Sequence, residues 1–389
     1  VVDLVSEAQE QKGRGQQFME RFARIYSPAV LALGAGVLLV GGGVSGDWSE
    51  WALRAATVLV AAAPCALVIS IPVTYVAAMG RASRDGVLIK GGIYLEELGR
   101  LRAIALDKTG TVTTGHMSLA SVHPADGVDE TELLFLAGSL EDASEHPIGR
   151  AVADGARQRG IDLTIASPDY TTSQGHDLNP AVTTVIEDLE SNGNTTVVMA
   201  DPTGPLAVLA VADTIRPQAA DTIHRLRALG VKHITMLTGD NPRTARAIAT
   251  RAGIDHVDAS LKPEDKAARI RQLVDEHHHV AMVGDGINDA PPLAAASVGI
   301  AMGTAGSDIA LETADVALMA DDLTRLVTAI TIGRRTRRVV TQNLILSLII
   351  LAALVPAALF GVIGLAAAVL AHELSELVVI LNGTRMAKK

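Results

Sequence analysis

The chain has 389 residues, of which 49% are hydrophobic and only 3% aromatic, and its formal net charge is −10. A mean hydropathy of +0.31 is too high for an ordinary soluble protein and too low for a chain that lies wholly in a membrane, so we expect both kinds of region. The acidic balance argues against nucleic acid as a partner, and the single cysteine excludes an intramolecular disulfide and a cysteine-cluster zinc site.

The first residues are polar and helix-like, and no signal peptide is visible among them. The chain begins without Met, so we expect it to be a fragment. Residues 28–80 predict a first membrane hairpin, built from the segments 28–46 and 55–80. The second segment is 26 residues long and, as a helix, would reach about 39 Å, more than a bilayer core requires.

Pro64 and Cys65 lie side by side in the second segment. Proline removes a backbone donor and clashes with the preceding turn, so it frees carbonyl groups that need partners. The thiol of Cys65 becomes a thiolate ligand when a cation binds. The same pair also fits a kinked helix in which the cysteine is only a small apolar residue.

Residues 334–389 predict a second membrane hairpin, divided near Phe360 and Gly361. Its last helix contains His372 and Glu373, polar groups that are costly in a bilayer unless they have a function. Clusters of arginine and lysine precede the first apolar segment, follow the second and precede the third. The positive-inside rule therefore predicts a multi-pass protein of the cell membrane, with the middle region, residues 81–333, in the cytoplasm.

The middle region predicts an α/β domain. Apolar runs with the character of buried strands alternate with helical patterns over residues 101–107, 195–200, 206–213, 233–240, 279–285 and 297–303. Such alternation implies a parallel sheet with its ligand site at the carboxyl ends of the strands. Residues 116–205 interrupt the pattern and predict an inserted domain.

Acidic and hydroxyl side chains gather at those strand ends. Asp107 opens "DKTGTVT" after a buried strand, which suits a carboxylate nucleophile that forms an aspartyl phosphate. Paired carboxylates beside a phosphate form a hard-oxygen site for Mg²⁺, and a nearby lysine can offset the charge of a moving phosphoryl group. The further candidates lie in "TGDN", "KPEDK" and "GDGINDAP" and are Thr238, Lys266, Asp285, Asn288 and Asp289.

The order DKTGT, TGD and GDGxNDAP resembles the P-type ATPases, whose phosphorylation domain is haloacid dehalogenase-like. The resemblance implies ATP and Mg²⁺ as cofactors, residues 81–115 and 206–333 as the phosphorylation domain, and residues 116–205 as an α+β nucleotide-binding domain. Asp107 would be phosphorylated, Thr238 and Lys266 would contact the phosphate, and Thr109 replaces the general acid of related phosphatases. The implied magnesium site comprises Asp107, Thr109, Asp285, Asn288 and Asp289. The implied nucleotide site comprises Glu145, His146, Gly175, Asp213, Arg216, Gly239 and Asp240.

"SEHPIGRA", "APC" and "AHELSE" resemble the heavy-metal branch of that family, in particular its cobalt/zinc-type members. The resemblance implies that Cys65, His372 and Glu373 bind the transported ion, while Glu376 is either a further ligand or a partner of Arg385. It implies ATP-driven export of a divalent metal of the zinc, cobalt, cadmium and nickel class. The implied partners are ATP, the metal cation and the lipid bilayer, with no obligate protein partner evident. The resemblance covers the later part of a pump and implies that residues 1–27 are the cytoplasmic helical link that follows the actuator domain. We therefore expect this chain alone to be phosphorylated without completing transport.

Three other interpretations stay open at this stage. The first is a pump for Cu⁺ or another monovalent cation, the second is a phosphatase tethered to the membrane, and the third is a metal-binding remnant that does not transport. The divalent pump is favoured because one thiolate, one imidazole and one carboxylate form a borderline ligand set that does not select Cu⁺.

Overall fold

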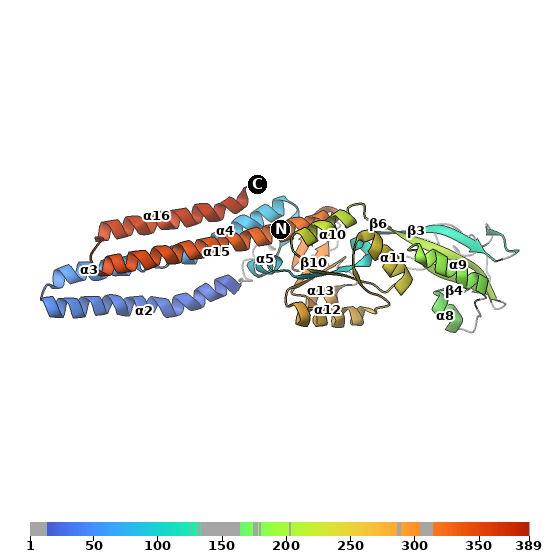
Figure 1. Cartoon of the computed structure of the whole chain (residues 1–389), viewed down its shortest axis with the longest axis horizontal. Coiled ribbons are helices and arrows are strands. Elements are labelled where there is room, and N and C mark those ends of the chain that lie inside the picture. Colours follow the sequence, from blue (N-terminus) through green and yellow to red (C-terminus); the bar gives the residue numbers. More distant parts are fainter. Residues whose placement is uncertain are drawn as a thin grey trace. The chain divides into compact units, whose positions relative to one another are not determined.

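The computed structural model describes residues 14–125, 127–130, 133, 164–173, 178, 180–201, 204–285, 289–303 and 314–388 (Figure 1). These residues divide into two compact units. The first comprises the chain up to Leu101 together with 315–320 and 325–389, and the second comprises 102–314 with 321–324.

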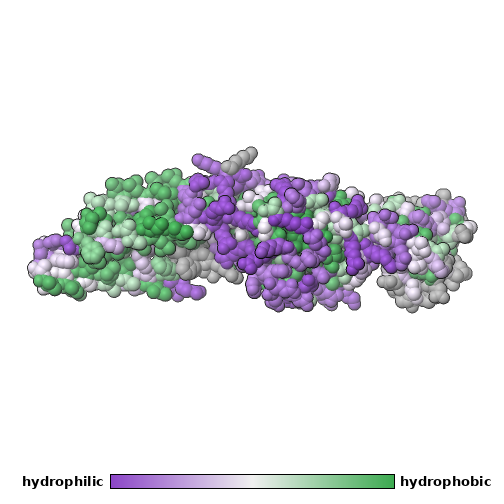
Figure 2. Space-filling model, viewed as in Figure 1, coloured by the Kyte–Doolittle hydropathy of each residue, from purple (hydrophilic) through white to green (hydrophobic). Residues whose placement is uncertain are grey.

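The first unit is dominated by long apolar helices. They are α2 (Arg14–Ser45), α3 (Trp48–Ala61), α4 (Cys65–Arg84), α15 (Thr324–Leu359) and α16 (Leu365–Thr384). Four segments of the described residues are long and apolar enough to cross a membrane, with α3 and α4 forming one of them. Figure 2 shows hydrophobic residues covering this part of the surface, as expected for helices whose outer faces contact lipid. The short elements of the unit are β1 (Val87–Ile89), which pairs antiparallel with β11 (Val316–Leu318), and α5 (Gly92–Leu98). They also include the turns η3 (Arg385–Ala387) and η2 (Met319–Asp321), although Asp321 itself belongs to the second unit.

The predicted interruptions of the membrane segments are confirmed. The second segment breaks between Ala61, where α3 ends, and Cys65, where α4 begins, because Pro64 cannot continue the helix. The last apolar run divides at Gly361, which has a φ of +71°, a conformation that glycine adopts without strain. Among the described residues, the four apolar segments therefore include one that is broken before Cys65, and the last two are separated by the turn at Gly361.

The second unit is built on a parallel sheet. Its strand order is β10 (Val298–Met302), β9 (Val280–Gly284), β2 (Ala103–Asp107), β7 (His233–Leu237) and β8 (His256–Asp258). All the neighbouring pairs are parallel, which confirms the predicted α/β architecture. The helices that alternate with these strands are α10 (Ala219–Ala228), α11 (Pro242–Ala252), α12 (Pro263–His277) and α13 (Ala290–Ala295). Leu237, Met282 and Leu273 lie in one fully buried cluster, which fixes α12 on the sheet and thereby the strand ends beside it.

A second, antiparallel sheet interrupts this pattern. Its order is β3 (Thr113–Pro124), β6 (Gly204–Ile215), β5 (Thr195–Asp201) and β4 (Thr164–Ala166), with α8 (Pro168–Ser173) and α9 (Pro180–Ser191) beside it. Ile186 of α9 packs against Val198 and Val208. The prediction that residues 195–200 and 206–213 belong to the parallel sheet is wrong, because they form β5 and β6, which pair with each other, and β6 also pairs with β3. An apolar run identifies a buried strand but does not identify its partner strands.

Candidate functional site

Three predicted residues meet at the carboxyl edge of the parallel sheet. Asp107 is the last residue of β2, and Lys266 reaches it from the first turns of α12. The Lys266 Nζ atom lies 2.5 Å from Asp107 Oδ1 and 3.0 Å from Asp289 Oδ1. Asp289 immediately precedes α13 and is 1% exposed, while Asp107 is 5% exposed. One lysine therefore connects the two buried carboxylates that the sequence predicts as nucleophile and magnesium ligand.

The electrostatic balance of this site is negative. Burial, and then the charge of Asp289, raises the pKa of Asp107 to about 7, although Lys266 acts in the opposite direction. Burial also raises the pKa of Asp289. Burial would lower the pKa of Lys266, but Asp107 and Asp289 raise it overall, so the lysine is a cation. One cation facing Asp107, Asp289 and the nearby Asp285 leaves excess negative charge on hard oxygen atoms, which fits Mg²⁺.

Gly284 permits the approach of Asp289 to the sheet. A Cβ atom at Gly284 would lie 2.5 Å from Asp289 Oδ2 and 2.9 Å from its Cβ. Contacts this short are forbidden, so only glycine fits at the end of β9. The first glycine of "GDGINDAP" is therefore explained by the packing of the carboxylate that follows it.

The turn η1 (Lys108–Val112) follows Asp107 and is held from two sides. The Lys108 side chain is 2% exposed, and its Nζ atom lies 2.5 Å from Oδ2 of Asp240. Gly110 has a φ of +69°. A Cβ there would lie 3.5 Å from Asp285 Cβ, so the turn passes directly beside Asp285. Thr109 lies within this turn in an extended backbone conformation.

Arg216 holds the same turn through hydrogen bonds to its backbone. It is 5% exposed, and it donates to the carbonyl oxygens of Thr111 (2.9 Å) and Gly110 (2.9 Å). Two of its nitrogens also contact the Asp321 carboxylate, at 2.6 and 3.0 Å. All three guanidinium nitrogens of Arg216 therefore bind to backbone or side-chain oxygens of the chain itself. The structure thus places this predicted nucleotide residue as a positioning residue for the turn.

Asp213 joins the two long strands of the second sheet. It accepts hydrogen bonds from Thr113 Oγ1 (2.5 Å) and from the Gly115 backbone N–H (3.0 Å). Burial raises the pKa of Asp213, although these hydrogen bonds act in the opposite direction. Its observed contacts are therefore with β3, close to the point where that strand leaves η1.

Thr238, Gly239 and Asp240 form the turn after β7. Thr238 is 3% exposed, and its Oγ1 accepts from the Asp240 N–H at 3.1 Å. Gly239 is exposed. The structure brings Thr238 and Asp240 to the same sheet edge as Asp107, since β2 and β7 are paired neighbours with Asp107 beside Leu237. Glu145, His146, Gly175 and Asn288 lie outside the described residues.

The helix break between α3 and α4 in the first unit leaves backbone carbonyl groups outside the regular helical hydrogen-bond pattern. The Tyr26 hydroxyl of α2 donates to the Ala62 carbonyl oxygen at 2.9 Å, and the N–H groups of Leu67 and Val68 both donate to the Pro64 carbonyl. The Ala62 carbonyl, which the break removes from the helical hydrogen-bond pattern, thus accepts a hydrogen bond from a side chain, as expected for a carbonyl freed by a proline. Cys65 follows as the first residue of α4.

Cys65, His372 and Glu376 form a candidate metal site. One ligand atom from each residue lies within 4.8 Å of the other two. His372 is 8% exposed, and Ser375 donates to its carbonyl oxygen at 2.7 Å. Glu373 is exposed and is not part of this group. His372 and Glu376 are four residues apart and share a helix face, whereas Glu373 is rotated by about 100° from His372.

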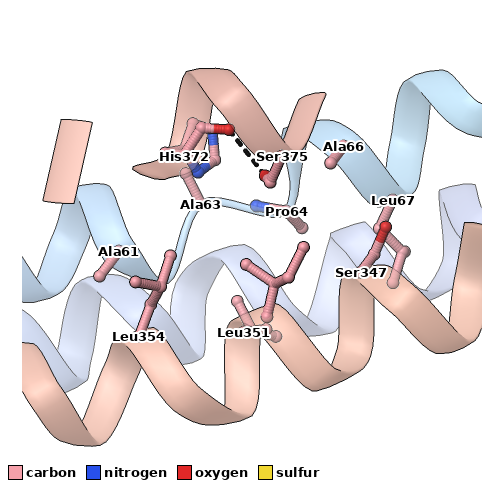
Figure 3. Close-up of a pocket in the computed structure, with 11 residues that line it drawn as sticks. Ala61, Ala63, Pro64, Ala66, Leu67, Ser347, Leu351, Leu354, His372 and Ser375 are labelled. Atoms are coloured by element: carbon pink, nitrogen blue, oxygen red, sulfur yellow. Dashed lines mark hydrogen bonds between the residues drawn. The ribbon is translucent and has the colours of Figure 1, made fainter. Parts of the chain in front are cut away.

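A small cavity lies beside this cluster (Figure 3). Its volume is about 20 Å³, room for roughly one water-sized group. Pro64, His372 and Ser375 line it on one side, with Ser347 and Leu351 of α15 opposite. The buried Ser347 hydroxyl has no hydrogen-bond partner among the described residues. A polar group therefore faces the helix break from α15.

Comparison with known proteins identifies the class. Residues 101–297 match the family of haloacid dehalogenase-like hydrolases, so the chain belongs to that family. The whole chain is also similar to two crystal structures of a zinc-transporting PIB-type ATPase, with 38% identity, TM-scores of 0.78 and 0.70, and coverage of 66% of those chains. The predicted fold, an α/β haloacid dehalogenase-like domain with an inserted domain and membrane helices, is confirmed.

The curated relatives are named as metal pumps. The chain is 38% identical to a probable cadmium-transporting ATPase of Listeria monocytogenes, 39% identical to a zinc/cadmium/lead-transporting P-type ATPase of Escherichia coli and 44% identical to a probable cation-transporting ATPase G of Mycobacterium bovis. Each match covers 100% of this chain and 59%, 55% and 52% of the relative, respectively. The chain therefore spans between about half and three-fifths of the length of these relatives. The predicted resemblance to heavy-metal-transporting P-type ATPases and the predicted multi-pass membrane location are confirmed.

Proposed function

We propose that this chain supplies the phosphorylated domain and the ion-binding helices of a pump that uses ATP to export a divalent heavy-metal cation from the cytoplasm. The observation that carries the proposal is the coexistence of two sites in one chain. Lys266 connects Asp107 and Asp289 in the second unit, while Cys65, His372 and Glu376 converge at a helix break in the first.

The first site supports phosphoryl transfer to a carboxylate. Asp107 would attack the γ-phosphorus of ATP, forming an oxygen–phosphorus bond as the bond to the ADP leaving group breaks. Lys266 lies where it can offset charge on the transferred group, and Arg216 holds the turn that follows the nucleophile. Mg²⁺, when bound by Asp107, Asp285 and Asp289, would supply charge neutralisation for the phosphate oxygens.

The second site supports the choice of ion. A thiolate, an imidazole and a carboxylate suit Zn²⁺, Cd²⁺, Co²⁺ or Ni²⁺ better than Cu⁺, which prefers purely soft ligands. The adjoining position Leu351 is apolar, so the cavity wall there carries no cation that would compete with the metal. A carboxylate and a thiolate would together neutralise a divalent charge within the membrane.

Acid-stable phosphorylation from radiolabelled ATP tests the proposal. The full-length protein and Asp107→Asn would be compared across Zn²⁺, Cd²⁺, Co²⁺, Ni²⁺ and Cu⁺. We expect label that needs both Asp107 and a divalent metal, with Cu⁺ ineffective. Label that is independent of every metal would favour the phosphatase, and complete absence of label would favour the metal-binding remnant.

A further inference from the structure

A basic pocket lies at one end of the membrane helices in the first unit. It has a volume of about 540 Å³. Arginines and polar residues line it, from α15 and from the segment that follows α5: Arg100, Arg334, Arg337, Arg338, Thr341 and Gln342. This cavity is separate from the Cys65 site, with which it shares no lining residue.

A close contact between two glycines builds the pocket. A Cβ on Gly99 would lie 2.7 Å from the Gly333 carbonyl oxygen, and a Cβ on Gly333 would lie 2.7 Å from the Gly99 nitrogen. The end of α5 therefore lies directly on α15, which places Arg100 beside Arg334. Arg334 also donates to the Leu101 carbonyl oxygen at 3.4 Å. The pocket is thus a product of tertiary packing between segments more than 200 residues apart in sequence.

The positive charge of the pocket is only partly neutralised. Arg100 contacts Glu96 at 3.8 Å, and its buried Nε atom has no hydrogen-bond partner among the described residues. The exposed side chains of Arg337 and Arg338 make no ion pair or hydrogen bond with any residue that the structure describes. Guanidinium groups present several planar donors and suit the oxygen atoms of a phosphate.

The surface next to the arginines is apolar. Ile345 lines the pocket, and Leu348 and Ile349 continue along α15 with 50% and 60% exposure. These residues lie in a segment long and apolar enough to cross a membrane. A ligand that fits both parts has an anionic phosphate at one end and hydrocarbon at the other.

We propose that this pocket binds the headgroup of an anionic phospholipid, with the acyl chains along Ile345, Leu348 and Ile349. Basic residues next to a membrane helix attract anionic lipid, and basic pockets between helices bind anionic headgroups. The combination of two exposed, unpaired arginines with an adjoining apolar helix face distinguishes a lipid from a free phosphate, which would gain nothing from the apolar residues.

The test uses the full-length protein in detergent micelles, titrated with phosphatidylglycerol or phosphatidylcholine and measured by native mass spectrometry. We expect a clear preference for phosphatidylglycerol, and Arg337→Gln/Arg338→Gln should lower its affinity by about 30-fold, since each basic residue near a membrane surface contributes about fivefold. The matched control is Arg21→Gln/Arg24→Gln, which changes two exposed arginines near the start of another membrane segment outside the pocket. It should bind phosphatidylglycerol like the unmodified protein.

Two further arms decide the source of the phosphate. Ile345→Ser/Ile349→Ser should weaken phosphatidylglycerol binding, and inorganic phosphate at millimolar concentration should not displace the lipid. Full displacement by inorganic phosphate would show a phosphate site and overturn the proposal. Equal binding of the two lipids, or an equal loss in the Arg21 and Arg24 control, would also overturn it. Thermal unfolding without added lipid should be the same for all variants, because the substituted arginines and isoleucines are all exposed.

Discussion

Arg216 contacts Asp321 through two nitrogen–oxygen pairs, at 2.6 and 3.0 Å, while it donates to the backbone of the turn that follows Asp107. The two residues are 105 positions apart in the chain. A single buried side chain thus connects the turn after the nucleophile to the segment that follows the parallel sheet.

Replacing Arg216 should therefore loosen this turn. Arg216→Lys keeps the charge but loses the planar set of donors, so the carbonyl oxygens of Gly110 and Thr111 would lose partners, and the buried Thr111 oxygen alone would cost about 1–3 kcal/mol. We expect a Tm lower by several degrees and slower phosphorylation. Arg225→Lys is the matched control, since Arg225 is exposed on α10, and it should change neither quantity. An unchanged Tm for Arg216→Lys would contradict the positioning role.

Lys266 should be required for phosphoryl transfer. Lys266→Met removes the cation between Asp107 and Asp289, and we expect phosphorylation from ATP to slow by about 10²–10³-fold, the range for loss of one preorganised electrostatic group. Lys262→Gln, an exposed lysine at the start of the same helix, should retain the normal rate. Rapid-quench measurement of the phosphoenzyme distinguishes the two, and equal rates in both variants would exclude the assigned role.

Glu376 and Glu373 provide an internal comparison at the candidate metal site. Glu376→Gln should lower the affinity for Zn²⁺ or Cd²⁺ by about tenfold or more, because a carboxylate facing Cys65 and His372 is lost. Glu373→Gln should have a small effect, since that side chain is exposed on another face of α16. Metal-dependent phosphorylation, titrated with free metal, measures both. A larger effect of Glu373→Gln would restore the ligand set predicted from the sequence resemblance.

Gly284 should be intolerant of a methyl group. In Gly284→Ala the new Cβ would collide with the Asp289 carboxylate, so Asp289 must move away from Lys266 and the magnesium site. We expect a higher Mg²⁺ concentration for half-maximal phosphorylation. Gly80→Ala adds a methyl group where nothing lies within 4 Å and serves as the control. An unchanged Mg²⁺ requirement in Gly284→Ala would show that the observed packing is not needed.

His233 should make stability depend on pH. Its ring stacks on His256 at 4.3 Å and lies 4.8 Å from the ring of His277. Burial lowers the pKa of His233 from its ordinary value of 6.5; His256, His277 and Arg269 lower it further, and Glu276 opposes them. The unfolded chain therefore binds a proton at a higher pH than the folded chain, so stability falls as pH decreases below about 6.5.

His233→Phe keeps an aromatic ring without a titratable group. It should show a smaller decrease of Tm between pH 7 and pH 5 than the unmodified protein. The exposed His116→Gln should retain the full decrease. The same pH profile in all three proteins would rule out a contribution from His233.

The sequence predicts which side chains gather at one edge of the parallel sheet, because local patterns encode the strand ends. Asp107 ends an apolar strand, and parallel strands bring their carboxyl ends to one edge, so Thr238 and Asp289 could be expected beside it. The role of Arg216 could not be predicted, because its partners are distant in sequence and two of them are backbone carbonyls. Glu376 could have been found from helical spacing alone, since it follows His372 by four residues. The pairing of residues 204–215 with β3 could not be predicted, because an apolar strand pattern does not specify which strand lies next to it.

The hydrogen bond from Tyr26 to the Ala62 carbonyl has a consequence for the pump proposed above. The residue pair connects α2 to the backbone just before Cys65, so sliding or rotation of α2 would remove a donor from a carbonyl at the helix break. That carbonyl would then need a new partner, and a bound cation is one that it can accept. A movement of α2 would in this way change the partner of a backbone oxygen three residues before Cys65.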